Sequence, residues 1–144
     1  RMFCAKVQAE PFDIADEHWK LSTVGPSVGA IVSFVGQVRD EPLELEHYPA
    51  MAERQMQALL AEARAHWPLI GCTMIHRFGR LEVGAPIVLV LTASSHRLAA
   101  FEAAQFLMDW LKTRAPFWKK GAGGCVEARA DDEAAAARWG TRWD

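Results

Sequence analysis

Hydrophobic and polar residues alternate along the chain with two periods, and each period predicts one kind of element. Stretches with a period of two, or with short unbroken apolar runs, predict strands at residues 3–8, 29–39, 43–48, 70–81, 87–91 and 125–128. Apolar residues at three- and four-residue steps predict helices at residues 13–21, 49–67, 96–115 and 131–139. The varied connections do not fit regular βαβ winding. We therefore expect an α+β fold, one domain spanning residues 1–144, with an antiparallel or mixed sheet and flanking helices.

Single residues refine these predicted elements. Asp13 is expected to cap the first helix, and Gly36 to permit a bulge or the close approach of another group. We expect both faces of the strand at 29–39 to be covered, and the five apolar residues at 87–91 to form a central, buried strand. The helix at 49–67 should bury one stripe of side chains: Ala52, Met56, Leu59, Leu60, Ala63 and Trp67.

The third predicted helix brings basic residues to its start. Ser94 or Ser95 can cap it, and Pro116 ends it because proline lacks an N–H group and restricts the residue before it. His96 and Arg97 then fall in the first turn, where backbone N–H groups favour an anion. One face of this helix is expected to be buried through these residues: Leu98, Phe101, Ala104, Met108 and Leu111.

Positive charge gathers at the other end of the same helix. Residues 110–126 contain no acid but four fixed cations: Lys112, Arg114, Lys119 and Lys120. Aromatic residues lie between them, which indicates an anion site beside apolar walls. The alternative is structural: cations are favoured at a helix C-terminus, and Asp109 can pair with Lys112 three residues later.

Composition excludes several classes of protein. The formal net charge of the 144 residues is -2, with 51% hydrophobic and 24% charged residues, as in ordinary soluble globular proteins and unlike basic nucleic-acid-binding domains. The three cysteines are widely spaced, which fits a reducing compartment. Neither a secretory leader nor a membrane span is recognisable, so we expect a cytoplasmic protein that binds neither nucleic acid nor membrane.

Other candidate residues carry less specific signals. Arg39 ends a predicted strand next to a glycine-containing stretch and is either a cleft residue or an ordinary surface arginine. Cys72 and His76 share a strand face but lie about 13 Å apart at roughly 3.3 Å per residue, too far for one metal ion. We therefore expect no metal site, and the nucleotide-binding and acyl-hydrolase motifs are absent from the sequence.

Several segments together resemble the large, catalytic subunit of molybdopterin synthase. They occur in the family's order over nearly the whole chain, and the run from Lys112 to Lys120 with the upstream His96-Arg97 pair is the most specific. The segments are Phe34-Val35-Gly36-Gln37-Val38-Arg39, residues 45–51, Ile75-His76-Arg77-Phe78-Gly79, Ser95-His96-Arg97, residues 101–103, residues 111–120 and residues 126–129.

The resemblance implies an α/β-hammerhead fold and a homodimer that binds a small ubiquitin-like sulfur-carrier subunit at each end, giving a heterotetramer. It implies a sulfurtransferase that uses the thiocarboxylate of the carrier's Gly-Gly tail to convert cyclic pyranopterin monophosphate into the dithiolene of molybdopterin. No cofactor is implied. Both reactants are anions, which agrees with the cluster of cations read from the residues.

The same resemblance assigns roles to single residues. Lys112 and Lys119 match the catalytic lysines, and Phe34 and Met108 match the lining of the channel for the carrier tail. The substrate-binding positions are Gln37, Val38, Arg39, His96, Arg97, Lys120, Gly121 and Arg129. Gln37 and Val38 are expected to act through their backbone, and Arg129 to reach across the dimer interface.

We expect these cations, which come from separate parts of the fold, to converge in one sheltered pocket. Two alternatives remain: a binding module that grips a carrier tail without turnover, and an unrelated phosphate-binding enzyme that shares the basic run. The link between Arg39 and Leu43 is several residues shorter than in the family that the sequence resembles.

Overall fold

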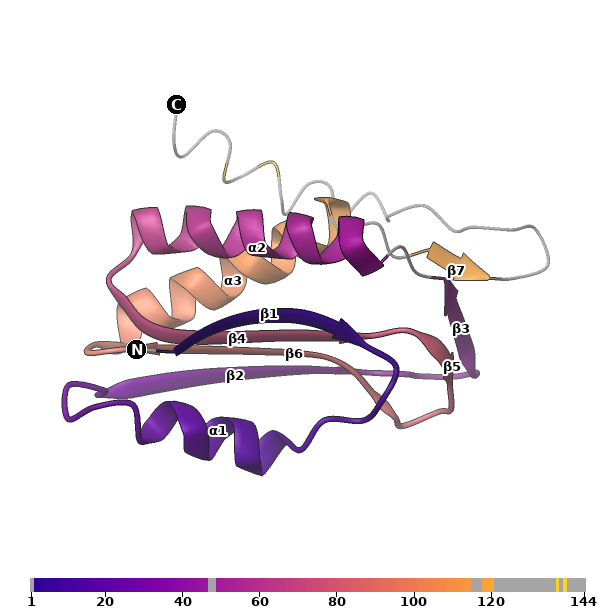
Figure 1. Cartoon of the computed structure of the whole chain (residues 1–144), viewed down its shortest axis with the longest axis horizontal. Helices are drawn as coiled ribbons and strands as arrows, with labels where there is room; N and C mark the ends of the chain where they lie inside the picture. The colour runs from indigo at the N-terminus through magenta and orange to yellow at the C-terminus, as the bar shows by residue number, and fades with distance from the viewer. Residues whose placement is uncertain (1, 47–48, 115–117, 121–136, 138, 140–144) are drawn as a thin grey trace.

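The computed structural model describes residues 2–46, 49–114, 118–120, 137 and 139. Strands and helices alternate irregularly along the chain (Figure 1). They are β1 (Met2–Gln8), α1 (Ile14–Ser22), β2 (Ala30–Gln37), β3 (Leu43–Glu46), α2 (Pro49–His66), β4 (Leu69–Arg77), β5 (Gly79–Leu81), β6 (Pro86–Ser94), α3 (Arg97–Arg114) and β7 (Trp118–Lys120).

The main sheet has the strand order β1-β4-β6-β2. β1 runs parallel to β4, whereas β6 is antiparallel to both β4 and β2, so the sheet is mixed. α1 covers one face of this sheet, and α2 and α3 cover the other (Figure 1). This arrangement confirms the predicted α+β class and the predicted central position of β6, and it places β1 at an edge of the sheet.

A second, three-stranded sheet has the order β5-β3-β7. The prediction of one long strand at 70–81 is wrong, because the chain leaves the main sheet after Arg77 and enters this smaller sheet at Gly79. Gly79 has φ +90, a backbone conformation that glycine adopts without the steric cost of a side chain. Phe78 at the junction donates its N–H to the carbonyl of Gln8 at 3.1 Å.

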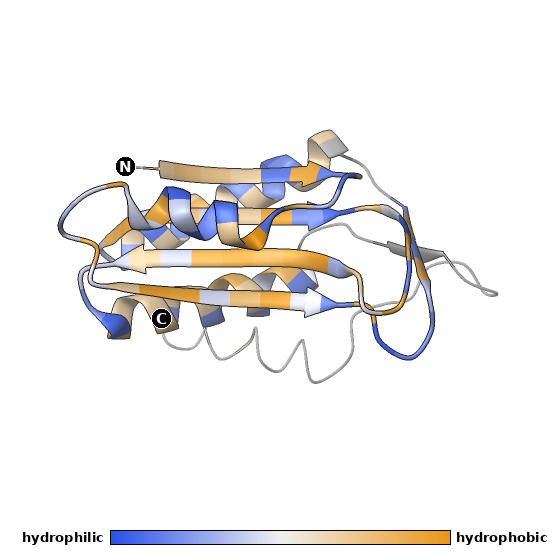
Figure 2. Cartoon of the chain, turned by 90° about the horizontal axis from the view of Figure 1, so that it is seen from below, coloured by the Kyte–Doolittle hydropathy of each residue, from blue (hydrophilic) through white to orange (hydrophobic). Residues whose placement is uncertain are grey.

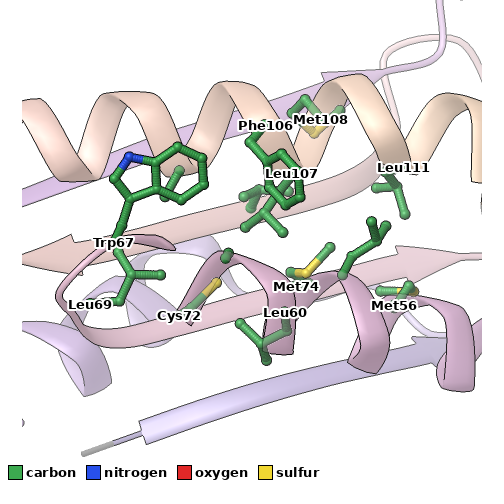
Figure 3. Packing of buried hydrophobic residues seen from close by; sticks show 14 of the residues in the cluster. Met56, Leu60, Trp67, Leu69, Cys72, Met74, Phe106, Leu107, Met108 and Leu111 are labelled. Carbon is green, nitrogen blue, oxygen red and sulfur yellow. The ribbon is translucent and has the colours of Figure 1, made fainter. Parts of the chain in front are cut away.

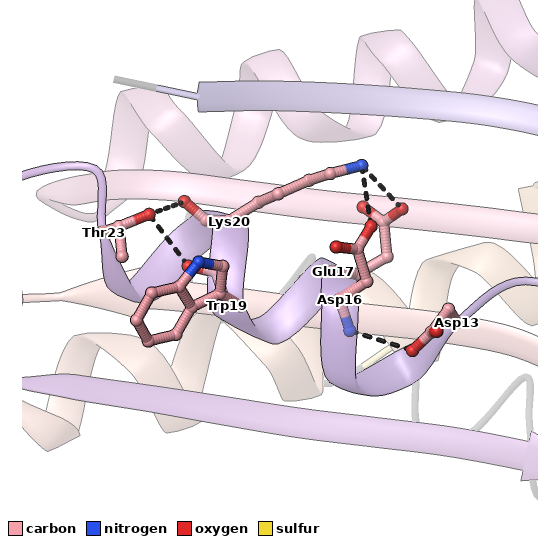
Figure 4. A network of polar contacts seen from close by, with 6 residues as sticks. All are labelled: Asp13, Asp16, Glu17, Trp19, Lys20 and Thr23. Carbon is pink, nitrogen blue, oxygen red and sulfur yellow. Dashed lines mark hydrogen bonds and ion pairs between the residues drawn. The ribbon is translucent and has the colours of Figure 1, made fainter.

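Local side-chain contacts fix the ends of α1. The Asp13 side chain accepts a hydrogen bond from the N–H of Asp16 at 2.9 Å, as expected for the N-cap residue (Figure 4). Lys20 pairs with Asp16 and Glu17, and the Thr23 hydroxyl donates to the carbonyl of Trp19 at 3.0 Å.

β2 forms the other edge of the main sheet. The ladder between β2 and β6 shifts register between Gly36 and Gln37, and a Cβ atom at Gly36 would lie 2.7 Å from a methyl carbon of Val88. Both the expected bulge and the expected close approach are therefore present. The expectation that both faces of β2 are covered is wrong for Phe34, which is 39% exposed, because an edge strand has a neighbour on one side only.

The largest hydrophobic cluster lies between the main sheet and the pair α2–α3 (Figure 3). Every residue of the predicted α2 stripe is buried, which confirms that prediction. A smaller cluster fills the α1 side, and hydrophobic colour follows the strands as seen from that side (Figure 2). A third cluster, made of Val38, Leu45 and Leu81, joins the main sheet to the smaller one.

The predicted buried face of α3 is only partly right. Ala104, Met108 and Leu111 are buried, but Leu98 and Phe101 are 68% and 60% exposed. Alanines near the start of the helix, among them Ala100 and Ala103, occupy the interior positions instead, because their small side chains let the helix lie close to the sheet.

Ser94 is not the helix cap that the sequence allowed. It is the last residue of β6, and its hydroxyl donates to the carbonyl of Pro68 at 2.9 Å. The helix begins at Arg97, directly after His96.

The predicted strand at 125–128 and most of the predicted helix at 131–139 lie outside the described residues. Trp139 is described and is buried against Trp67 and Phe106, with ring centroids 5.7 Å from each. Its indole N–H donates to the Asp109 carboxylate at 2.6 Å.

Candidate functional site

Five parts of the chain come together at one end of the main sheet. Gln37 of β2 aligns with Pro86, and His76 of β4 aligns with Val88, so the end of β2, the end of β4 and the start of β6 lie together. α3 follows β6 and runs back along the sheet, which brings its last turns to this end, next to the smaller sheet (Figure 1). We call this region the Lys112 end and the opposite end of the sheet, at Ser94, the His96 end.

Lys112 is an exposed residue in the last turn of α3. Ion pairs among the described residues join Lys20 to Asp16 and Glu17, and Arg80 to Glu82, so Lys112 has no ion-pair partner within that part of the chain. The alternative that Asp109 pairs with Lys112 is wrong, because the carboxylate of Asp109 is directed into the interior. It accepts hydrogen bonds from Gln105 Nε2 at 2.8 Å and from Trp139.

His76 lies near enough to Lys112 for the charge of the lysine to act on its ring, although the sequence indicated no role for this histidine beyond a rejected metal site. Its Nδ1 atom is 2.8 Å from the carbonyl oxygen of Arg77. Burial lowers the pKa of His76 to about 4; the positive charge of Lys112 acts in the same direction, and the hydrogen bond to Arg77 opposes both. The ring is therefore neutral near pH 7. From the sequence, His76 could have been noticed only through its position at the end of a largely apolar strand that is followed by a glycine.

Arg39 is exposed at the same end, two residues beyond β2. The N–H of Glu41 donates to the carbonyl of Arg39 at 2.8 Å, and Asp40 between them has φ 70. These features describe a γ-turn with a positive central φ, a rare and strained conformation for a residue with a side chain. The short link after Arg39 therefore reverses the chain directly and keeps Arg39 at the edge of the Lys112 end.

Gln37 and Val38 precede Arg39 and differ in exposure. Gln37 is exposed at the bulge, whereas the Val38 side chain is buried. The N–H of Val38 donates to Ala85, and its carbonyl accepts from the N–H of Gly84. The resemblance implies that the backbone of Val38 contacts a ligand. Because the N–H already donates within the chain, only the second lone pair of the carbonyl oxygen is left for that contact.

Lys119 and Lys120 are held at this end by their backbone. Both belong to β7, and they align with Leu45 and Glu44 of β3. Leu45 packs against Val38 in the cluster that joins the two sheets. Gly121 and Arg129, the other expected substrate-binding residues, lie outside the described residues.

Phe34 and Met108 lie on the same side of the main sheet. Phe34 alternates with Ile31 and Val35, which pack on the α1 side, so its side chain is directed to the α3 side. Met108 is 9% exposed on α3 and belongs to the main core cluster. The two side chains therefore share one face of the main sheet, and their role in lining a tail channel stays a prediction.

His96 and Arg97 do not join this group within one chain. Both are exposed at the His96 end. Arg97 and Lys112 are fifteen residues apart on α3, which corresponds to roughly 22 Å at 1.5 Å per residue. A continuous helix therefore holds the two groups of cations apart within one chain, so their expected convergence in one pocket requires a second chain and stays a prediction.

The described residues contain neither a metal-binding cluster nor a membrane-spanning helix. No cluster of three or more His, Cys, Asp or Glu side chains in these residues has a metal-binding arrangement. No helix among them has the length and apolar character needed to cross a bilayer.

The sequence model of the family described as MoaE protein matches residues 7–114, three quarters of the chain. The chain belongs to the MoaE family. A MoaE relative from Mesorhizobium japonicum, named molybdopterin synthase catalytic subunit, is 52% identical over 93% of this chain and 91% of its own length. This membership confirms the resemblance read from the sequence. The chain is an enzyme subunit with the function of this family, that of a molybdopterin synthase catalytic subunit in molybdenum cofactor biosynthesis.

Solved structures agree with the assignment to MoaE. The molybdopterin cofactor biosynthesis protein E from Burkholderia multivorans superposes with a TM-score of 0.88 at 45% identity, covering 97% of this chain and 98% of that one. A Helicobacter pylori structure, described as a complex of subunits 1 and 2 of molybdopterin-converting factor, has a TM-score of 0.69 at 19% identity and covers 88% of this chain and 90% of that one. At that identity the likeness shows the fold alone.

Proposed function

We propose that this MoaE chain transfers sulfur from the C-terminal thiocarboxylate of a small ubiquitin-like carrier to cyclic pyranopterin monophosphate, forming the dithiolene of molybdopterin. The observation that carries the proposal is the pair of exposed cations at the Lys112 end, Lys112 and Arg39, neither of which has an ion-pair partner among the described residues. Unpaired cations beside apolar side chains suit a reaction in which both reactants are anions.

The carrier is proposed to insert its Gly-Gly tail past Phe34 and Met108 towards Lys112. The relative from Mesorhizobium japonicum is named a catalytic subunit, a name that supports at least one further subunit in the enzyme. We place the assembly in the cytoplasm as a heterotetramer of two MoaE chains and two carriers.

The two lysines receive separate roles in this proposal. Lys112 contacts the thiocarboxylate, where an ammonium group stabilises the negative charge that develops during transfer, and its neutral amine can act as a nucleophile. Lys119, together with Lys120, Gly121 and Arg39, binds the phosphate of the precursor and assists proton transfer. Gln37 and Val38 complete the site through backbone groups.

The remaining cations are proposed to come from a second copy of the chain. β2 is an edge strand that runs from the His96 end to the Lys112 end. An antiparallel, two-fold arrangement of two chains along β2 would bring His96 and Arg97 of one copy to the Lys112 end of the other. Leu98 and Phe101, both exposed beside Arg97, would then be covered by that copy. Arg129 is proposed to reach across the same interface.

The test replaces Lys112 in a chain supplied with thiocarboxylated carrier and the cyclic precursor, with the product measured by mass. We expect Lys112→Ala to fold and bind carrier normally but to lose about a hundred- to a thousandfold in rate, because a cation that stabilises developing charge is removed. Lys112→Arg keeps the charge but does not readily deprotonate, so it separates charge stabilisation from nucleophilic attack.

Two outcomes would contradict the proposal. Normal turnover by Lys112→Ala would remove this lysine from the chemistry. Tight carrier binding by the unmodified chain without any product would instead indicate a binding module.

A further inference from the structure

Arg77, the last residue of β4, is half-buried and has no part in the proposed reaction. Its Nε and Nη2 atoms donate to the carbonyl oxygen of Ala9 at 3.1 and 3.0 Å, and its Nη1 atom donates to the carbonyl oxygen of Pro86 at 3.3 Å. Ala9 directly follows β1, and Pro86 is the first residue of β6. One side chain therefore joins the ends of three neighbouring strands, β1, β4 and β6.

The bond from Arg77 to Pro86 lies just beyond the end of a backbone ladder. The last aligned pair of β4 and β6 is His76 with Val88, and Pro86 lies two residues before Val88. The guanidinium group thus continues the connection between the two strands where the aligned backbone pairs stop. Arginine suits this place because its planar group presents several N–H donors in a fixed geometry, whereas a lysine ammonium is a compact charge on a flexible stem.

Pro86 belongs to a segment that holds Val38 by two backbone hydrogen bonds. The N–H of Val38 donates to the carbonyl of Ala85 at 3.0 Å, and the carbonyl of Val38 accepts from the residue before Ala85 at 2.8 Å. The Val38 side chain is buried in the cluster that joins the two sheets. Arg39 is the next residue along the chain. A short path of hydrogen bonds and covalent bonds therefore links Arg77 to the backbone of Arg39.

The two arginines on this path have different tasks. Each of the three nitrogens of the Arg77 guanidinium donates to a backbone carbonyl, so this group supports the protein's own chain. Arg39 is exposed, and the ion pairs among the described residues do not include it, so its charge is available to an anion. Because the chain reverses directly after Arg39, its position depends on the attachment of Val38 before it.

We propose that Arg77 is a positioning residue for the cyclic precursor, because it fixes the 84–86 segment and through it the place of Arg39. The inference rests on the proposed function, in which Arg39 binds the phosphate of the precursor, and adds a residue that contacts neither reactant. If the segment shifts, Arg39 no longer meets the phosphate at hydrogen-bond distance, whereas Lys112 on α3 keeps its place. The loss should therefore fall on the binding of the precursor and not on the chemical step.

Arg77→Met keeps an unbranched apolar stem but removes every donor. In the complex with thiocarboxylated carrier, we expect KM for the precursor to rise about tenfold, because hydrogen bonds to charged groups are typically worth at least this much. Both kcat and Kd for the carrier should stay within about twofold of the wild-type values.

Arg80→Met is the matched control for this substitution. Arg80 is an exposed arginine of β5 whose side chain pairs with Glu82 at 3.1 Å, so its loss removes the same charge without freeing the 84–86 segment. KM for the precursor should therefore be unchanged in Arg80→Met. An equal rise of KM in the Arg77 and Arg80 variants would mean that charge alone matters, and would overturn the inference.

A double-mutant cycle tests whether Arg77 acts through Arg39. In chains that carry Arg39→Ala, the additional Arg77→Met should raise KM by no more than about twofold, because the contact that it positions is already lost. A full rise in both backgrounds would overturn the inference, as would a wild-type KM in Arg77→Met or a loss confined to kcat. If Arg39→Ala alone leaves KM unchanged, the proposed placement of the precursor fails together with the inference. If Arg39→Ala raises KM but Arg77→Met does not, the inference fails alone.

Arg77→Lys replaces the methionine variant if the latter does not fold, because it keeps the positive charge without the planar fork. The measurement is then hydrogen exchange of the Val38 amide, which should be at least about tenfold faster than in the wild-type chain, while the amides of α2 keep their rates. Unchanged exchange at Val38 would contradict the support by Arg77. Equal acceleration at Val38 and in α2 would show a general loss of stability and would overturn the inference as well.

Discussion

Lys112 and His76 lie at the same end of the sheet in opposite electrostatic environments. Lys112 is exposed, whereas burial lowers the pKa of His76 and keeps its ring neutral. Neither state follows from residue type alone, because the exposure of Lys112 depends on where α3 ends. The protonation of His76 depends on strands far away in the sequence that cover it.

The neutral state of His76 makes stability depend on pH. Its pKa falls from 6.5 to about 4 on folding, so between these values the unfolded chain binds a proton that the folded chain does not. The free energy of unfolding should therefore fall as the pH drops from 6.5 to 4, by at most about 3 kcal/mol from this residue.

Urea unfolding at several pH values checks this expectation. His76→Gln should show a smaller loss of stability across this window than the wild-type chain, while the same change at the exposed His18 should leave the loss unchanged. Equal pH slopes for the wild-type and His76→Gln chains would contradict the assignment.

Among the elements, α3 is one whose position along the chain could be predicted from the sequence but whose buried face could be predicted only in part. Apolar spacing placed the helix correctly, and Pro116 marked its end within two residues. The inward face was partly misassigned, because alanine fits either side of a helix and the larger Leu98 and Phe101 look like better core residues. The division of 70–81 into β4 and β5 was also missed, since apolar residues continue through Phe78 and only Gly79 marks the turn.

The start of α3 depends on a glycine at the entry to β2. A Cβ atom at Gly29 would lie 2.2 Å from the carbonyl oxygen of Ser95, a backbone atom, while the N–H of Gly29 donates to Ser94 at 3.0 Å. We expect Gly29→Ala to lose roughly 1–3 kcal/mol of stability and to displace the segment that carries His96 and Arg97.

Gly25→Ala is the matched control for this substitution, because nothing lies within 4 Å of the added carbon. Its stability in chemical unfolding should stay within about 0.5 kcal/mol of the wild-type value. Equal stability of the two variants would mean that the turn adapts without cost.

At the scale of the whole molecule, one helix separates two groups of cations that one reaction is proposed to need. The residues proposed to carry this chemistry could be named from the sequence because their types and order match a family. Their distribution between the two ends of the main sheet could not be predicted from the sequence, since it depends on how α3 lies against β2. The separation of Arg97 from Lys112 is the reason that a second copy enters the proposal.

Mixing two inactive variants tests whether the second copy completes the site. If sites form between copies, Lys112→Ala and Arg97→Ala chains should each be impaired alone, and random re-pairing should restore about a quarter of wild-type activity, because half the dimers are mixed and each holds one intact site. If every site belongs to one chain, mixing restores nothing. Repeating the experiment with Leu98→Glu in both chains, which places a charge on the proposed interface, should abolish the recovery.

The parallel pairing of β1 with β4 also has a consequence for synthesis of the chain. β1 is translated before its partner, because it lies at the sheet edge and pairs with β4, which begins only at Leu69, with Met2 aligned to Gly71. While the ribosome makes the intervening segments, this first strand has no ladder to join. Its unpaired amides are open to misassociation or to capture by a chaperone until β4 emerges.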